Sequence, residues 1–144
     1  MAKVTASAER TIDAPAEKVR ELVADYAETR PKILTEHYRD YEVVEGGTGA
    51  GTKAKWKLQA TSKRVRDVAA SVSEPEAGTL VETDANSSMV TTWTVRPAGE
   101  RSVVRVETSW DGAGGIGGFF EKTFAPGGLR KIYDGVLGRL AELV

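Results

Sequence analysis

The sequence predicts an α+β fold in which one curved antiparallel sheet of about seven strands is covered on one face by helices. Two observations carry most of this prediction. Six segments that alternate apolar and polar residues follow one another from Tyr41 to Trp110 without a helix between them. After them, Ile116–Val144 repeats apolar residues at helical spacing. Strands joined by short turns pair antiparallel with their neighbours, and one face of such a sheet must be buried under helices.

The first third of the chain predicts a strand followed by two short helices. Residues from Val4 to Ile12 alternate as a half-buried strand does, and Pro15 suits the first turn of a helix that follows. The apolar residues of this first helix share one face, and they are Val19, Leu22, Val23 and Tyr26. A second helix or turn is expected over Glu28–Leu34, where Pro31 interrupts the pattern.

The six later strands are expected at Tyr41–Glu45, Lys53–Ala60, Arg64–Val72, Thr79–Thr83, Met89–Val95 and Ser102–Trp110. Their turns are expected at Gly46–Gly51, Glu74–Gly78 and Pro97–Gly99, where glycine and proline gather. The second of these strands alternates most clearly. It carries Trp56 and Leu58 on one face and three lysines on the other, so its inner face is predicted without ambiguity.

The closing segment predicts one long helix over Ile116–Val144, kinked at Pro126. Gly127 and Gly128 follow this proline, and each costs about 1 kcal/mol relative to alanine inside a helix. Such a cost indicates either close approach of another backbone or space for a bound molecule.

Composition narrows the classes of function. The chain has 144 residues, 40% of them apolar, which predicts one globular domain over residues 1–144. Its formal net charge of -1 gives no reason to bind nucleic acid or an anionic membrane, and no segment is long and apolar enough to insert stably. The absence of cysteine excludes disulfides and thiolate chemistry. We expect a cytoplasmic protein, monomeric or weakly dimeric.

The order of elements resembles the helix-grip fold of the START-like superfamily, which includes polyketide cyclases and lipid-transfer proteins. The resemblance covers the whole chain and is most specific at Ile12–Val19 and in the Gly-rich entry to the proline-containing final helix. It implies a cavity between sheet and helix that holds a small hydrophobic molecule. Arg20 and Arg30-Pro31 stand where many relatives carry an aromatic residue and a Trp-Pro pair.

Two glycine-rich motifs mimic nucleotide-binding loops. Gly112–Gly117 has the spacing GxGxxG, but only the closing helix follows it, whereas a dinucleotide-binding unit needs a second parallel strand. Gly46–Lys53 resembles a phosphate-binding loop, but it leads into a strand and is interpreted as a hairpin. No cofactor is therefore expected.

Catalytic candidates are few: His37, Tyr41, Arg66 and Glu82. His37 is the sole histidine and the one side chain whose ordinary pKa lies near neutrality, yet no partner is visible to orient it. We therefore favour the interpretation of His37 as an ordinary polar residue just before the sheet over a role as acid or base. With one histidine and no acidic residues at ligand spacing, no metal site is expected.

Alternation along the strands and the closing helix predicts an apolar lining. The expected ligand-binding residues are Trp56, Leu58, Thr91, Trp93, Val106, Thr108, Trp110, Phe120, Phe124, Gly128 and Ile132. Periodicity does not separate the wall of a pocket from a densely filled core. Binding of a lipid, polyketide or isoprenoid is the first hypothesis. A cyclase or aromatase is the second, and a protein-interaction domain that presents Ile116, Phe119 and Phe120 is the third.

Overall fold

The computed structural model describes residues 3–61, 64–111 and 126–144, and within them it confirms the helix-grip class. One antiparallel sheet has the order β1-β7-β6-β5-β4-β3-β2. The strands are β1 (Lys3–Ile12), β2 (Tyr38–Glu45), β3 (Lys53–Thr61), β4 (Arg64–Glu76), β5 (Thr79–Asp84), β6 (Val90–Ala98) and β7 (Arg101–Asp111). The helices are α1 (Ala16–Ala24), α2 (Thr29–Ile33) and α4 (Pro126–Glu142).

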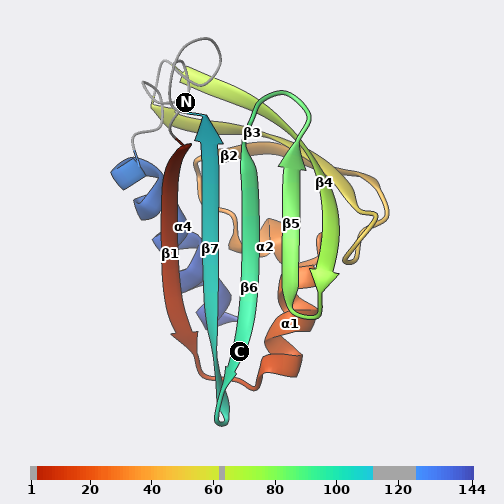
Figure 1. Cartoon of the computed structure of the whole chain (residues 1–144), viewed down its shortest axis with the longest axis vertical. Helices are drawn as coiled ribbons and strands as arrows, with labels where there is room; N and C mark the ends of the chain where they lie inside the picture. Colours follow the sequence, from red (N-terminus) through yellow and green to blue (C-terminus); the bar gives the residue numbers. More distant parts are fainter. Residues whose placement is uncertain (1–2, 62–63, 112–125) are drawn as a thin grey trace.

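The three helices of the described residues lie on one side of the sheet, behind it in the view of Figure 1. Helix α4 packs on β1 and α2, and α1 packs against β6 and β7. The inner face follows the predicted alternation, since Trp56, Leu58 and Trp93 are buried on it. The core therefore lies between this face and the helices, because that is where both kinds of element can bury their apolar side chains.

Two predicted turns, Glu74–Gly78 and Pro97–Gly99, are present but shorter, because the strand before each continues through its proline. Strand β4 runs through Pro75 to Glu76, and β6 runs through Pro97 to Ala98. The fixed φ of proline is compatible with extended backbone, and Pro75 lies where the β4–β5 register is irregular. The chain reverses at the last residue of each predicted turn, Gly78 (φ 82°) and Gly99 (φ 67°).

Asp25 lies between the two short helices, and the first of these helices is shorter than predicted. Its carboxylate accepts the backbone N–H of Glu28 (3.0 Å) and the hydroxyl of Thr29 (3.1 Å). The Glu28 N–H is the main cause that lowers the pKa of Asp25. Helix α1 ends at Ala24, so Tyr26 lies beyond it, although the side chain is fully buried.

Strand β2 begins at Tyr38, three residues earlier than predicted, and contains an irregularity in its register between Arg39 and Glu42. Asp40 lies in this irregularity with φ 52°, the one described residue other than glycine with a positive φ. The turn that follows, Gly46–Gly51, is the predicted hairpin connection, with four glycines at positive φ. It joins two strands and not a strand to a helix.

Several predictions concern residues outside those described. The GxGxxG motif at 112–117, the helical stretch 116–125 with Phe119, Phe120 and Phe124, and therefore the kink at Pro126, belong to this group. Helix α4 is described from Pro126 onwards. Across the described parts of the chain, no helix combines the length and apolarity needed to cross a membrane.

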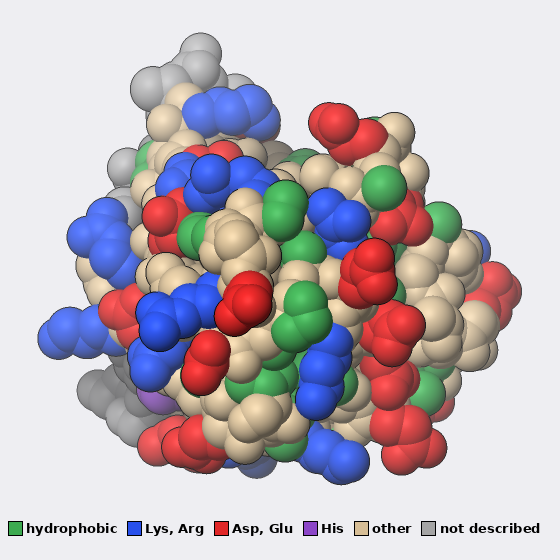
Figure 2. All heavy atoms as spheres, turned by 90° about the horizontal axis from the view of Figure 1, so that it is seen from below, with side chains coloured by type: hydrophobic (Ala, Val, Ile, Leu, Met, Phe, Trp, Pro, Cys, Tyr) green, Lys and Arg blue, Asp and Glu red, His purple; other side chains and the backbone are tan. Residues whose placement is uncertain are grey.

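The outer surface carries both signs of charge, as Figure 2 shows for one face. On the outer face of β3, the three lysines each meet a carboxylate: Lys53–Glu45 (4.0 Å), Lys55–Glu42 (3.6 Å) and Lys57–Asp67 (3.7 Å). These exposed pairs contribute little to stability. Because each lysine lies next to a carboxylate, the outer face of β3 does not form a continuous positively charged surface.

Candidate functional site

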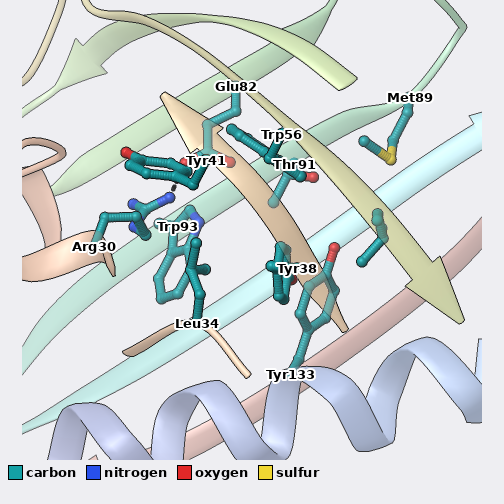
Figure 3. A pocket seen from close by; sticks show the side chains of 11 residues that line it. Arg30, Leu34, Tyr38, Tyr41, Trp56, Glu82, Met89, Thr91, Trp93 and Tyr133 are labelled. Atoms are coloured by element: carbon teal, nitrogen blue, oxygen red, sulfur yellow. Dashed lines mark hydrogen bonds and ion pairs between the residues drawn. The ribbon is translucent and has the colours of Figure 1, made fainter. Parts of the chain in front are cut away.

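A pocket lies between the inner face of β2–β6 and the helices α2 and α4 (Figure 3). It is lined by Arg30, Leu34, Tyr38, Tyr41, Trp56, Leu58, Glu82, Met89, Thr91, Trp93 and Tyr133. The cavity that these side chains leave measures about 20 Å³. That is room for about one water molecule, so the lining residues nearly fill the space themselves.

One end of the pocket is charged. Arg30 from α2 donates from Nη1 to Oε2 of Glu82 on β5 at 2.7 Å, and Tyr26 donates its hydroxyl to the same oxygen at 2.6 Å. Arg30 and Glu82 are 3% and 5% exposed. The guanidinium also lies over the rings of Tyr26 (4.1 Å) and Trp93 (4.7 Å). It is held by a carboxylate and two aromatic faces at once.

The pair compensates its own charge. Burial by itself would lower the pKa of Arg30, but the Glu82 carboxylate together with Tyr26 and Tyr41 outweighs burial and raises that pKa above its ordinary value. Arg30 Nη2 donates to the carbonyl of Val23 at 3.1 Å. Both hydrogen bonds to Glu82 fall on Oε2, so Oε1 receives none from a described residue. A carboxylate oxygen without a donor is a strong acceptor for a hydrogen-bond donor in the pocket.

Another part of the pocket carries a chain of buried hydroxyls. Tyr133 on α4 is hydrogen-bonded to Thr108 on β7, which is 2.7 Å from the hydroxyl of Thr91 on β6. In Figure 3 the hydroxyl of Tyr133 points from the helix toward Thr91. Burial raises the pKa of Tyr133 to about 12, so its hydroxyl is protonated at neutral pH and can donate or accept a hydrogen bond.

Aromatic rings form the wall between these two polar ends. Tyr41 stacks on Trp56, with ring centroids 5.9 Å apart and planes at 28°, and Tyr38 meets the same indole at 6.4 Å and 58°. The Tyr41 hydroxyl donates to the carbonyl of Tyr26 at 2.6 Å. Burial raises the pKa of Tyr41 to about 12 and that of Tyr38 well above its ordinary value. The wall is therefore aromatic and uncharged at neutral pH.

Two indole N–H groups of this wall, Trp56 Nε1 and Trp93 Nε1, are buried without a hydrogen-bond acceptor. A buried donor without an acceptor costs about 1–3 kcal/mol. Buried unpaired donors are uncommon in folded proteins, so their presence in the pocket wall is consistent with a ligand or water as the missing acceptor.

Six of the sequence-predicted site residues meet in this pocket: Tyr41, Trp56, Leu58, Glu82, Thr91 and Trp93. Thr108 lies one hydrogen bond behind them. Val106, Trp110 and Ile132 are buried in the core and do not line the pocket.

The remaining predicted residues lie elsewhere. His37 is outside the pocket, with Nδ1 2.9 Å from the Thr35 hydroxyl. Arg66 is half-buried on β4 and is not among the lining residues. Gly128 is exposed, and a Cβ built there meets no atom of the described residues within 4 Å. Of the two alternatives for Gly127 and Gly128, close approach of another backbone therefore does not occur within the described part of the chain. Among the described residues, no three His, Cys, Asp or Glu side chains cluster as metal ligands.

The predicted site omitted Arg30, Leu34, Tyr38, Met89 and Tyr133, which line the pocket. One sequence signal pointed to the charged end. Leu80 and Glu82 are two positions apart in β5, so they share its inward face. A charged residue at an inward position needs a partner of opposite charge. Arg30 could not be chosen as that partner from the sequence, because it is distant along the chain and pairs only through the packing of α2.

Comparisons with known proteins agree with this architecture. The family model described as polyketide cyclase/dehydrase and lipid transport matches residues 1–144. No curated protein matches the sequence. The NMR solution structure of KanY protein is 54% identical, covers 99% of this chain and 98% of its own, and has a TM-score of 0.89.

More distant solved structures share the fold alone. A START superfamily protein from Mycobacterium smegmatis is 14% identical, with 97% of this chain and 99% of that chain covered and a TM-score of 0.71. Norcoclaurine synthase from Thalictrum flavum, in complex with dopamine and hydroxybenzaldehyde, is 13% identical. The match covers 99% of this chain and 86% of that chain, with a TM-score of 0.69.

Proposed function

The chain belongs to the polyketide cyclase/dehydrase and lipid-transport family, and on that premise we propose that it binds and carries a small, largely hydrophobic molecule of lipid, polyketide or isoprenoid type. The observation that carries the proposal is the composition of the pocket between the sheet and α4. Its walls are mainly aromatic and aliphatic, and a few polar groups stand at defined positions. This combination is typical of small-molecule sites.

Binding requires the pocket to open, because its cavity of about 20 Å³ is far smaller than such a ligand. Leu34, Leu58 and Met89 are the aliphatic side chains of the lining, and methionine is the most adaptable of them. Each 100 Å² of apolar ligand surface removed from water contributes about 2.5 kcal/mol, which favours displacement of these side chains by the ligand.

The decisive experiment is native mass spectrometry of the freshly purified protein, followed by denaturing extraction and identification of what is released. A stoichiometric apolar adduct is the expected result. A bare chain that also fails to take up fatty acids, aromatic polyketides or isoprenoid alcohols would overturn the proposal.

A matched pair of variants locates the adduct. Leu34→Trp fills the pocket, and Leu143→Trp makes the same change at a residue that is 39% exposed. We expect loss of the adduct in the first variant and its retention in the second. Retention in both would place the ligand elsewhere.

A second candidate function is catalysis in the same pocket, of the cyclase or aromatase kind. It is favoured by the buried Glu82 carboxylate, which has one oxygen free of described donors, beside protonated tyrosine hydroxyls. A bound poly-carbonyl chain would then exchange protons with these groups while the walls hold its fold. Turnover unchanged in both Glu82→Gln and Tyr41→Phe would exclude this assignment.

A further inference from the structure

Glu82 presents a single unused acceptor to the pocket. Tyr26 and Arg30 both donate to Oε2, and no described residue donates to Oε1, although the side chain is 5% exposed. Little of the Glu82 side chain is exposed to water, so a donor from a ligand would stabilise Oε1. The pocket therefore favours a ligand with a hydroxyl or N–H group at this end.

Arg30 offers a single unpaired donor and no pair of donors for an anion, because only its Nε is buried without an acceptor. Its Nη1 and Nη2 atoms donate to Glu82 and to the Val23 carbonyl. The guanidinium carbon also lies over the rings of Tyr26 (4.1 Å) and Trp93 (4.7 Å). A ligand carboxylate or phosphate would have to displace these contacts.

The net charge of the buried groups also limits the ligand. Arg30 and Glu82 form one ion pair that is almost fully removed from water. A cationic or anionic ligand would add a third buried charge without a counterion, and an uncompensated buried charge is strongly unfavourable. An uncharged donor satisfies Glu82 Oε1 without this cost.

The shape of the wall defines the rest of the ligand. Tyr41 and Trp56 form a stack next to Glu82 in Figure 3, and Tyr38 lies across the same indole. Planar rings pack against such a surface in offset-stacked or edge-to-face geometry. The hydroxyl of Tyr38 makes no hydrogen bond to a described residue, so it can donate to the ligand oxygen or nitrogen that donates to Glu82.

We infer that the ligand is an uncharged aromatic molecule whose hydroxyl or N–H group donates to Glu82 Oε1 while its ring packs against the Tyr38–Tyr41–Trp56 wall. This inference rests on the proposed function and names the ligand class of the same pocket. It makes Glu82 a specificity residue that distinguishes a hydrogen-bond donor from its methylated or charged analogue.

Four probes with one naphthalene ring test the inference: 2-naphthol, 2-methoxynaphthalene, 2-naphthoate and 2-naphthylmethylammonium. The readout is titration by NMR, with the indole N–H resonances of Trp56 and Trp93 as reporters and assignment by Trp→Phe substitution. We expect 2-naphthol to bind at least about tenfold more tightly than the ether, as one hydrogen bond to a charged acceptor provides. Both charged probes should bind more weakly than 2-naphthol.

A paired variant removes the acceptor without leaving a buried charge. In Arg30→Met/Glu82→Leu, 2-naphthol and its ether should bind equally. The control is Arg96→Met/Glu9→Leu, which makes the same changes at an exposed ion pair (3.1 Å) and should keep the preference. If the first variant does not fold, the relative affinities of the four probes for the wild-type chain still test the inference.

Each contrary result overturns a defined statement. Equal binding of 2-naphthol and its ether to the wild type, or preference for a charged probe, would overturn the ligand class and leave hydrophobic carriage intact. Indole shifts with none of the probes would also overturn it. The proposed function is decided separately by the mass of the copurified complex.

Discussion

Tyr38 and Tyr41 lie three residues apart in β2, yet both side chains face the pocket and meet Trp56. Regular alternation would place residues three apart on opposite faces of a strand. The register explains the exception, because Arg39 pairs with Lys57 while Glu42 pairs with Lys55. One extra residue is therefore accommodated in β2, and this bulge turns both tyrosines inward.

Asp40 carries the backbone conformation of this bulge, with φ 52°. We predict that Asp40→Gly preserves or slightly raises the free energy of unfolding, because glycine adopts positive φ without strain. Asp40→Val should lower it by about 1–2 kcal/mol, since a β-branched residue is disfavoured there. Urea denaturation followed by tryptophan fluorescence measures both, and equal stability of the two variants would refute the role of the bulge.

The buried Arg30–Glu82 pair should show strong coupling in a double-mutant cycle. Glu82→Leu alone leaves the Arg30 charge buried and should cost about 3–5 kcal/mol, whereas Arg30→Met/Glu82→Leu should recover most of that loss. The free energies of unfolding of the wild type, both single variants and the double variant give the coupling energy.

The exposed pair Arg96–Glu9 is the matched control for this cycle, with side chains 56% and 48% exposed. Its coupling should be about 0.2–1 kcal/mol, because water and salt screen it. A coupling at Arg30–Glu82 no larger than this value would contradict the buried placement of the pair.

All four tyrosines of the chain have a pKa raised by burial, to about 12 for Tyr41 and Tyr133. The unfolded chain therefore loses these protons first, near the ordinary pKa of 10.0. Stability should be fully present below about pH 10 and fall as the pH rises toward about 12.

Ultraviolet absorption of tyrosinate checks this prediction directly. The native protein should show little tyrosinate at pH 10 and then ionise together with unfolding. The Tyr133→Phe variant should lose less stability over the same pH interval. Titration of the native tyrosines near pH 10 without unfolding would show that they are solvated.

Two glycines of α4 should respond differently to alanine. A Cβ at Gly138 lies 3.9 Å from Arg10 Nη1, an ordinary contact, so Gly138→Ala should stabilise the protein by about 0.5–1 kcal/mol. A Cβ at Gly135 would lie 3.1 Å from Thr35 Cγ2, so Gly135→Ala should gain less or lose stability. Thermal unfolding of the two variants compares them, and an equal gain would mean that the segment at Thr35 moves freely.

The sequence by itself determined the fold class, the number of strands and the inner face of most of them. These features follow from local periodicity, and Trp56, Leu58, Thr91 and Trp93 all lie inward as alternation predicts. Strand ends were less accurate, because Pro75 and Pro97 were interpreted as turns although both fit extended backbone.

Tertiary structure alone decided the polar end of the pocket. Arg30 and Glu82 are separated by 52 positions, and no local pattern relates a residue of a short helix to one on β5. The bulge at Asp40 likewise overrides the alternation that would have turned Tyr38 away from Tyr41. Periodicity reports which side of an element is buried, whereas pairing across the core depends on how the elements pack, and the geometry of this site arises from that packing.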